Sequence, residues 1–327
     1  MTLKKRLTPF ALPGPLARRL DAMADTLMTP PGMAIDFAHP RGEAALSEPS
    51  SVSWRVFKNP VALFVGGVAA VLLELAEPRV RDGVWQHSTF RRDALTRLQR
   101  TGMAAMVTVY GARSVAEKLI AGVVRAHDKV TGTTREGEPY QANDPDLLLW
   151  VQTTATFGFV AAYNQYARSF SRAELDRAVA EAAPAARLYG VVEPPRSWGE
   201  LEQVFADWDA RLIAAPEIGE FLSIMHEVKA FPTAARPLQP LLLKAAIVLL
   251  PVHLQARLQL DGPKWRLRRW ERAVVTTAAR ASDRLVLRSA PPAQACRRIG
   301  LPEDWLYRSV SRRPEAPLRN LHPQPSK

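Results

Sequence analysis

The chain has 327 residues, a net charge of +12, 47% hydrophobic residues and one cysteine. A chain of this length can bury a core that folds without crosslinks. Cys296 has no cysteine partner, which excludes an internal disulfide framework and a CxxC metal site, and we expect a reducing, cytoplasmic location.

The first 50 residues are rich in proline and carry no helical period. Prolines follow the basic start MTLKKR before an apolar run of signal-peptide length develops, so we expect no secretion signal. Pro30-Pro31, Pro40 and Pro49 interrupt the remainder. We therefore predict an irregular N-terminal segment over residues 1–50 that wraps around or extends from the folded part.

Beyond residue 50 the pattern becomes helical. Asp144 followed by Pro145, and Ser171 three residues before Glu174, are typical helix starts. Apolar residues recur at intervals of three and four, which predicts helices over residues 61–75, 95–109, 115–130, 147–166, 175–188, 198–212, 218–228, 241–258 and 265–287.

The connections between these helices indicate a single domain. A polar stretch around Gly137 predicts a loop with a short hairpin. We find no internal repeat and no linker, so we predict one all-α globular domain over residues 51–311, followed by a disordered tail over residues 312–327. The most apolar stretches, residues 62–73 and 241–254, are shorter than the ~20 residues that span a bilayer and indicate buried helices.

Positive charge is concentrated near the C-terminus. Residues 261–327 hold 15 lysines and arginines against 6 aspartates and glutamates. Such a face could meet anionic lipid or an acidic partner protein, or it could be an ordinary solvated surface. No nucleic-acid motif accompanies it, so we expect no nucleic-acid partner and consider peripheral membrane contact through this region.

His127 is the first candidate for chemistry. Within VAEKLIAGVVRAHDKVTGT it shares a helix face with Val123, Val124 and Val130. An imidazole that points inward among apolar residues stays neutral, which is the state that a metal requires. The pattern alone nevertheless favours a hydrogen-bonded core histidine over a metal ligand.

Arg97, Arg100 and Thr101 form the second candidate. Their spacing in LTRLQRT, at i, i+3 and i+4, places them in one polar stripe on a helix. Guanidinium groups stay charged and could hold a propionate, a phosphate or a dioxygen-derived anion. Solvated arginines are the simpler interpretation.

The remaining histidines have no partner at metal-ligand spacing. His87, in WQHSTF, could be a second ligand or an acid–base group, although a His-Ser pair before a helix also fits a cap. The isolated ones are His39, His226, His253 and His322. The absence of HExxH, paired-carboxylate, phosphate-binding glycine and nucleophile-elbow motifs excludes zinc peptidases, di-iron bundles, P-loop enzymes and α/β hydrolases.

Four segments in order carry a resemblance to a known family. They are LELAEPRVRDGVWQHSTF, RLQRTGMAAMVTVYG, VVRAHDKVTGT and YQANDPDLLLWVQTT, with further similarity at VLLPVHLQARLQLDGPKW. In these segments the chain resembles the MpaB-like oxygenases, the helical superfamily that includes the latex-clearing proteins, or rubber oxygenases.

The resemblance implies an iron-containing haem b buried among helices, with His127 at the position of the family's proximal iron ligand. A haem held by one histidine leaves the opposite face of the iron free for dioxygen. Arg97 and Thr101 match the family's arginine and threonine near the haem. Arg100 stands where latex-clearing proteins place a lysine, so an axial role for that amine is not carried over.

By similarity, the reaction is dioxygen-dependent cleavage of a carbon–carbon double bond in an isoprenoid or another small apolar unsaturated substrate. A carboxylate base has been proposed in the rubber-cleaving branch. Glu74, Glu77 and Asp82 lie in the corresponding region, and the sequence does not choose among them. We take Glu77, together with Arg97 and Thr101, as the candidate catalytic residues.

Three positions depart from the family pattern. Glu77 and Gln152 stand where relatives commonly have histidine, and Thr131 stands where they have arginine. Gln152 is carried as a cofactor-binding candidate, and its substitution would alter activity if it lies in the haem or substrate shell. Two functions therefore stay open: a haem-dependent oxygenase, or a non-catalytic haem-binding or membrane-peripheral protein of the same fold.

Overall fold

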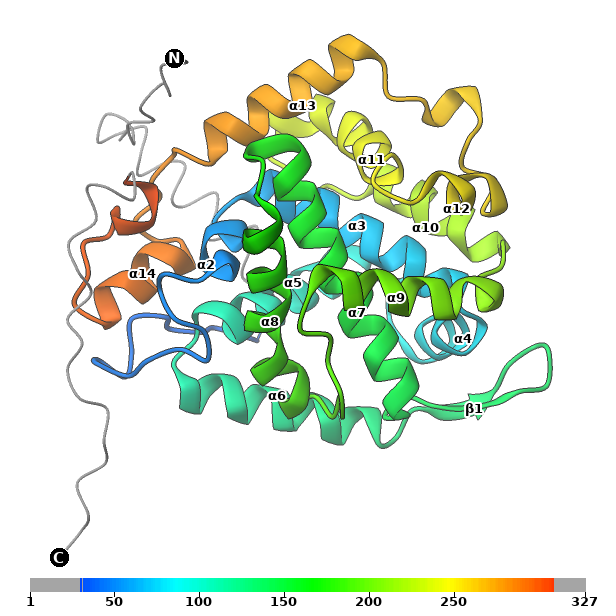
Figure 1. Cartoon of the computed structure of the whole chain (residues 1–327), viewed down its shortest axis with the longest axis horizontal. Coiled ribbons are helices and arrows are strands. Elements are labelled where there is room, and N and C mark those ends of the chain that lie inside the picture. The colour runs from blue at the N-terminus through cyan, green and yellow to red at the C-terminus, as the bar shows by residue number, and fades with distance from the viewer. Residues whose placement is uncertain (1–29, 31, 309–327) are drawn as a thin grey trace, which may run out of the picture.

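The computed structural model describes residue 30 and residues 32–308, and within them the chain is mostly helical, as predicted (Figure 1). The first half comprises α2 (Val52–Phe57), α3 (Pro60–Ala76), α4 (Pro78–His87), α5 (Ala94–Tyr110), α6 (Arg113–His127), β1 (Thr131–Thr133), β2 (Pro139–Gln141) and α7 (Pro145–Ala162). The second half comprises α8 (Arg172–Leu188), α9 (Trp198–Trp208), α10 (Pro216–Glu227), α11 (Gln239–Ile247), α12 (Val252–Arg257), α13 (Arg269–Ser282) and α14 (Pro291–Arg298).

The predicted helix starts and the predicted hairpin are confirmed. The Asp144 carboxylate accepts a hydrogen bond from the Asp146 backbone N–H at the start of α7, and Ser171 and Glu174 form a reciprocal capping box at the start of α8. β1 and β2 pair antiparallel, and Gly137 in their turn has a φ of +91°. Only glycine adopts that backbone conformation without strain.

Helices α3 and α7 cross at the centre of the molecule (Figure 1). At the crossing, a Cβ on Gly66 would lie 2.6 Å from the carbonyl oxygen of Gly158, so the two backbones meet without a side chain between them. The Trp150 indole N–H donates to the Leu73 carbonyl at 3.3 Å across the same pair. This crossing fixes how the side chains of the two helices face each other.

The two most apolar stretches form largely buried helices, as predicted. α3 packs against both α7 and α11, and most of its side chains are buried. No single helix among the described residues is long and apolar enough to cross a membrane, although α3 and α4 together reach that length and composition across a bend of 109°.

The ends of the described chain join one further core cluster. Phe37 from the irregular N-terminal segment is buried with Tyr110 of α5 and Cys296 of α14. Arg298, which is only 2% exposed, donates to the backbone carbonyls of Phe37 at 2.7 Å and Glu43 at 2.8 Å. The described part of the N-terminal segment therefore wraps around the helices and is fixed there by this arginine.

Some boundaries differ from the predictions for local reasons. The predicted helix over residues 241–258 is divided into α11 and α12 before Pro251, which has no N–H to continue the helix. α13 begins at Arg269, after a single 3-10 turn at Pro263–Trp265. α2, α4 and α14 are short helices that the apolar pattern did not indicate. The predicted tail over residues 312–327 and most of the segment over 1–50 lie outside the described residues.

Candidate functional site

His127 is the last residue of α6, and its imidazole is half-buried. The ring Nδ1 and the side-chain oxygen of Asn143 are both enclosed by protein, and a side-chain hydrogen bond with Asn143 acts on the His127 ring. The Asn143 amide N–H groups donate to the Val124 carbonyl at 3.0 Å and the Asp128 carboxylate at 2.7 Å. Asn143 is thereby held in place beside the imidazole.

The surroundings keep the His127 ring neutral. Burial lowers its pKa below the usual range, and the positive charge of Arg97 lowers the pKa further. Asn143 and Asp128 favour the protonated ring and partly oppose both effects. A neutral imidazole is the form that coordinates a metal, and a neighbouring acceptor such as Asn143 can orient the ring for that role.

The carboxyl group of Glu74, on α3, belongs to the same region. Burial raises its pKa to about 7, and the Thr154 hydroxyl and the Arg97 charge oppose that rise. Thr154 of α7 donates to the Glu74 carboxylate at 3.3 Å but also to the Val151 carbonyl at 2.9 Å, so its single hydroxyl proton is shared. Glu74 therefore exchanges a proton near neutral pH, which is the property of a general acid or base.

Arg97 of α5 couples electrostatically to both of these groups. Burial lowers the pKa of Arg97, Glu74 opposes that effect, and the charge of Arg100 adds to it. The Arg97 guanidinium donates to the Thr101 hydroxyl, which in turn donates to the Arg97 carbonyl at 2.9 Å. The predicted stripe is therefore present, with Arg97 half-buried and with Arg100 and Thr101 exposed.

Arg97 of α5 thus interacts electrostatically with Glu74 of α3 and with His127 of α6, and we call these three residues the Glu74–Arg97–His127 group. An apolar strip on α3 leads to it: Phe64, Gly67 and Val71 keep partial exposure at spacings of three and four that end at Glu74. Most neighbouring α3 side chains are buried, and Phe64 packs against the Phe231 ring with centroids 4.8 Å apart, so this strip is the partly exposed face of the helix.

The structure gives Glu77 a capping role. Its carboxylate accepts from the Val80 backbone N–H at 2.8 Å, as the N-cap of α4, and from the Arg79 guanidinium at 2.9 Å. Both carboxylate oxygens are thereby engaged, and the predicted catalytic role of Glu77 gains no support. The dipeptide Glu77-Pro78, an N-cap followed by a first-turn proline, was the sequence signal for this role.

Asp82, the third carboxylate of the region, also has both of its oxygens in hydrogen bonds. It is 1% exposed, it accepts from the Arg81 guanidinium at 2.9 Å, and it accepts from the Arg135 backbone N–H at 3.0 Å. These bonds tie α4 to the hairpin. Glu77 and Asp82 each pair with an arginine, whereas burial raises the pKa of Glu74 to about 7.

Gln152 points away from the Glu74–Arg97–His127 group. It lines a small hollow with side chains of α8 and α9, including Val179 and Leu201, and its amide N–H donates to Thr156 at 3.1 Å. Thr154, which contacts Glu74, lies two residues further along α7 and so on nearly the opposite face of the helix. The predicted cofactor contact of Gln152 is therefore not supported by its position.

The other described histidines lie apart from this group. His87 interacts with the Tyr140 hydroxyl at 3.1 Å, His39 with Asp36 at 2.7 Å and His253 with Asp209 at 2.9 Å, whereas His226 is exposed on α10. His322 lies outside the described residues. Within the described part of the chain, no three histidine, cysteine, aspartate or glutamate residues gather as a metal-binding cluster.

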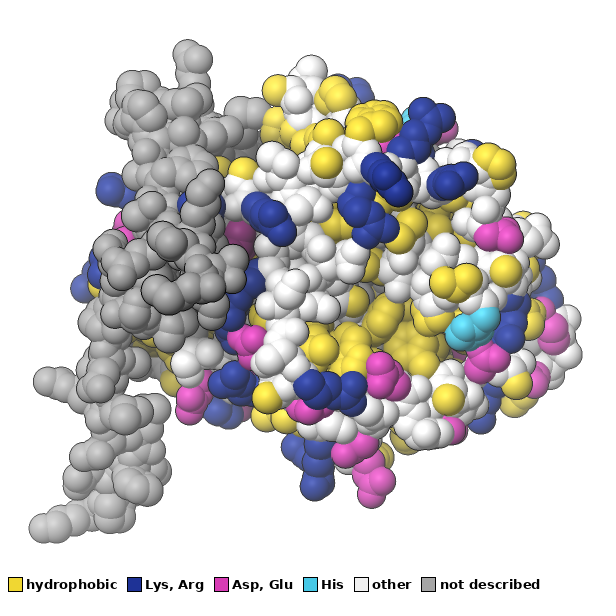
Figure 2. All heavy atoms as spheres, turned by 45° about the horizontal axis from the view of Figure 1, so that its top comes forward, with side chains coloured by type: hydrophobic (Ala, Val, Ile, Leu, Met, Phe, Trp, Pro, Cys, Tyr) yellow, Lys and Arg dark blue, Asp and Glu magenta, His cyan; other side chains and the backbone are white. Residues whose placement is uncertain are grey.

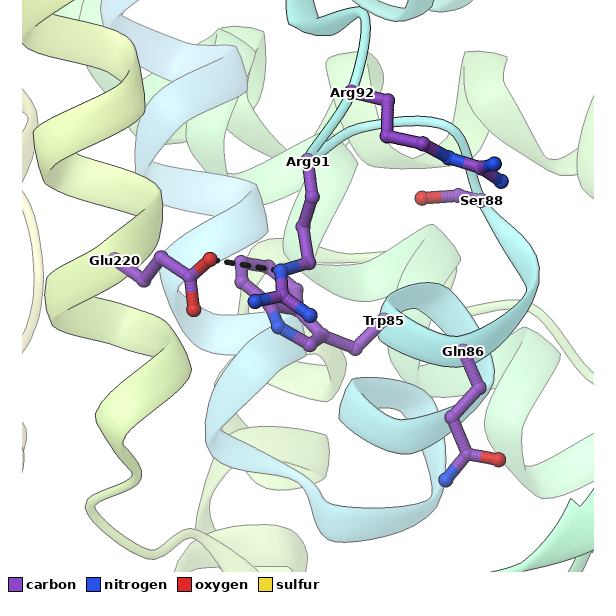
Figure 3. Close-up of a pocket in the computed structure, with 6 residues that line it drawn as sticks. All are labelled: Trp85, Gln86, Ser88, Arg91, Arg92 and Glu220. Carbon is purple, nitrogen blue, oxygen red and sulfur yellow. Dashed lines mark hydrogen bonds and ion pairs between the residues drawn. The ribbon is translucent and has the colours of Figure 1, made fainter.

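A surface pocket of about 440 Å³ lies elsewhere, beside the end of α4 (Figure 3). Its lining residues are Trp85, Gln86, Ser88, Arg91, Arg92 and Glu220. The Arg91 guanidinium pairs with Glu220 of α10 at 2.8 Å across this pocket. None of the predicted site residues lines it, because they belong to other faces of the fold.

Comparison with known proteins places the chain in a family. The family model described as "ER-bound oxygenase mpaB/B'/Rubber oxygenase, catalytic domain" matches residues 54–281, which is more than half of the chain and spans the Glu74–Arg97–His127 group. No curated protein and no solved structure matches the chain. The resemblance read from the four sequence segments is confirmed, and the chain belongs to the family of mpaB and rubber oxygenase catalytic domains.

Proposed function

We propose that this protein is a haem-dependent oxygenase that uses dioxygen to cleave a carbon–carbon double bond in an isoprenoid or another small apolar unsaturated molecule. Family membership supports the oxygenase class. The observation that carries the finer proposal is that the charge of Arg97 acts both on a neutral His127 and on a Glu74 carboxyl whose pKa is about 7.

The residues present fit a haem b group. His127 would provide a neutral imidazole nitrogen for the iron, and the neighbouring Asn143 would orient the ring. Arg97 and Arg100 would provide guanidinium groups for the propionates, and the Thr101 hydroxyl bonds the Arg97 carbonyl beside them. Haem b, when bound, would supply an iron that binds and activates dioxygen.

Side chains of the protein would bind the substrate and transfer a proton. The apolar strip of Phe64, Gly67 and Val71 would hold an unsaturated chain and keep water from it. Glu74, at the end of that strip, would accept a proton from the substrate and return it, since its pKa of about 7 matches neutral conditions. Arg97 holds the ionised state of Glu74 within reach by opposing the rise in its pKa.

An absorption spectrum tests the cofactor assignment. We would express the wild-type chain with added haem precursor, beside His127→Ala and the control His226→Ala, which removes an exposed histidine on α10. The proposal expects a Soret band in the wild type and in the control, and its loss in His127→Ala. A colourless wild-type protein that also fails to take up added haem would sink the proposal.

Oxygen consumption tests the reaction. The haem-loaded wild type should consume dioxygen with short polyprenyl substrates and release carbonyl products. Glu74→Gln should keep the Soret band and lose most of this activity, whereas Glu77→Gln should keep both, because Glu77 caps α4. A Soret band that depends on His127, with no consumption across a set of prenyl substrates, would instead identify a non-catalytic haem-binding protein.

A further inference from the structure

The start of α13 and the segment before it carry a dense positive charge. Lys264, Arg266, Arg268 and Arg269 are exposed, and Arg272 is half-buried one turn later. The single acidic residue among them, Glu271, is buried and is neutralised by Lys244 of α11 at 2.7 Å. These five basic residues, which we call the α13 basic edge, therefore outnumber the one carboxylate of their segment, which Lys244 already pairs.

The basic side chains of the α13 basic edge form no salt bridge in the described part of the chain, in contrast to Arg91 and Arg297. Elsewhere Arg91 pairs with Glu220 at 2.8 Å, and Arg297 pairs with Glu303 at 3.0 Å. None of the five basic residues forms a salt bridge to another residue within the described ranges. Lys264 lies 4.7 Å above the ring of Trp265, which leaves its charge intact. Within the described residues the edge therefore holds cations without salt-bridge partners, although the charge of Arg268 also acts on the buried Glu271 carboxylate.

The packing of the backbone fixes the positions of these basic residues. From Lys264 to Arg268 exposed basic residues alternate with half-buried ones, and the half-buried Trp265 and Leu267 pack against the main core cluster. The Glu271 carboxylate accepts from the Arg268 backbone N–H at 2.6 Å and so fixes the entry into α13. The basic side chains consequently project from one anchored stretch of chain.

Exposed apolar side chains lie close to the α13 basic edge. Trp270, between Arg269 and the buried Glu271, is 56% exposed, and Val252 at the start of α12 is 81% exposed. Figure 2 shows Lys and Arg side chains gathered with hydrophobic ones over the face formed by α11, α12 and α13. A large aromatic ring beside several cations is costly in water, but it suits the boundary between lipid headgroups and acyl chains.

We propose that the α13 basic edge and Trp270 dock this protein onto a membrane surface that contains anionic lipids. Guanidinium groups bind lipid phosphates through paired hydrogen bonds, and Trp270 would insert at the headgroup level. A soluble polyanion would use the same charges but would leave the exposed Trp270 and Val252 without a role. The proposal concerns a face apart from the Glu74–Arg97–His127 group and holds with or without bound haem.

Vesicle co-sedimentation of the full-length protein tests the charge requirement. Vesicles of phosphatidylcholine with phosphatidylserine should bind the wild type, and vesicles of phosphatidylcholine alone should not. Each basic side chain near an anionic bilayer strengthens binding about fivefold, so the triple variant Arg266→Gln, Arg268→Gln, Arg269→Gln should bind about 100-fold more weakly. A control with the same loss of charge on α6 and α8, Arg113→Gln, Lys118→Gln and Arg187→Gln, should stay close to the wild type.

Bromine-labelled phospholipids test the insertion of Trp270 directly. Quenching of tryptophan fluorescence by these lipids should be strong in the wild type and largely lost in Trp270→Phe, although seven other tryptophans remain of the eight. Circular dichroism checks that each variant is folded. Two results would overturn the proposal: equal binding by the triple variant and its control, or charge-dependent binding without any quenching that depends on Trp270. The second result would indicate a soluble polyanion as the partner.

Discussion

Thr154 of α7 donates its hydroxyl proton to Glu74 of α3 at 3.3 Å, in direct competition with the Val151 carbonyl at 2.9 Å. The shorter bond goes to the carbonyl, so the ionised Glu74 carboxylate is only partly stabilised. Burial can therefore dominate and raise the pKa of Glu74 to about 7. Burial thus makes Glu74 titratable near neutral pH, and the shared Thr154 hydroxyl only partly opposes that effect.

The first prediction concerns stability against pH. The pKa of Glu74 in the folded protein, about 7, lies above the ordinary value of 4.5, so the folded state binds this proton more tightly than the unfolded state. Stability from this group is complete below pH 4.5 and is lost as the pH rises through 7. Glu74→Gln stays neutral and avoids that loss. Between pH 5 and pH 8 the variant should gain about 2–3 kcal/mol relative to the wild type.

Urea denaturation at the two pH values measures this gain. Glu202→Gln, which neutralises an exposed carboxylate of α9, is the control and should show no comparable change. An equal stability difference between Glu74→Gln and the wild type at both pH values would contradict the prediction.

The second prediction concerns the charge of Arg97. That charge lowers the pKa of His127 and also that of Glu74. Replacement of Arg97 by glutamine should therefore raise both pKa values together. The ring protons of His127, followed by NMR between pH 4 and 8, would report the shift, and Arg113→Gln on the exposed start of α6 is the control. Movement of His127 in the opposite direction would show that the charge acts on it through a structural change.

The third prediction concerns the crossing of α3 and α7. A Cβ on Gly66 would meet the backbone of Gly158 at 2.6 Å, whereas a Cβ on the adjacent Gly67 would meet only a Phe159 ring atom at 3.8 Å. Gly66→Ala should cost about 1–3 kcal/mol, because two backbones must separate. Gly67→Ala should be neutral or stabilise by up to about 1 kcal/mol through helix propensity. Thermal unfolding of the two variants side by side decides between these outcomes.

The fourth prediction concerns Arg298. It donates to the carbonyls of Phe37 and Glu43, and replacement by methionine would leave both acceptors without this donor. We expect a loss of about 2–5 kcal/mol. The N-terminal segment should then be cut earlier in limited proteolysis. Arg297→Met, at an exposed neighbour, should leave the digestion pattern unchanged.

The local parts of the fold were predictable from the sequence. The capping box of Ser171 and Glu174, and the hairpin at Gly137, depend only on residues close in the chain. The inward face of His127 followed from helical spacing in the same way. α4 was missed because charged residues interrupt its apolar pattern, although Glu77-Pro78 marked its start.

The sequence alone did not show which of the three carboxylates belongs to the candidate site. Glu74 and Glu77 are one helical turn apart and look alike in the sequence, but α7 lies beside the first and the α4 backbone beside the second. That difference depends on how α3 packs in three dimensions. The orientation of Gln152 toward α8 and α9 has the same origin. The surroundings of each predicted site residue therefore depend on tertiary contacts that the sequence pattern does not show.

At the direct contact of Gly66 with Gly158, α3 and α7 meet through main-chain atoms alone. Glu74 stands eight residues further along α3, about 12 Å from that contact, and Thr154 stands four residues back along α7, about 6 Å from it. The close approach of the two backbones leaves no room for a side chain at this point. Side chains around the Glu74 carboxyl group can therefore be exchanged without moving the two helices that carry it.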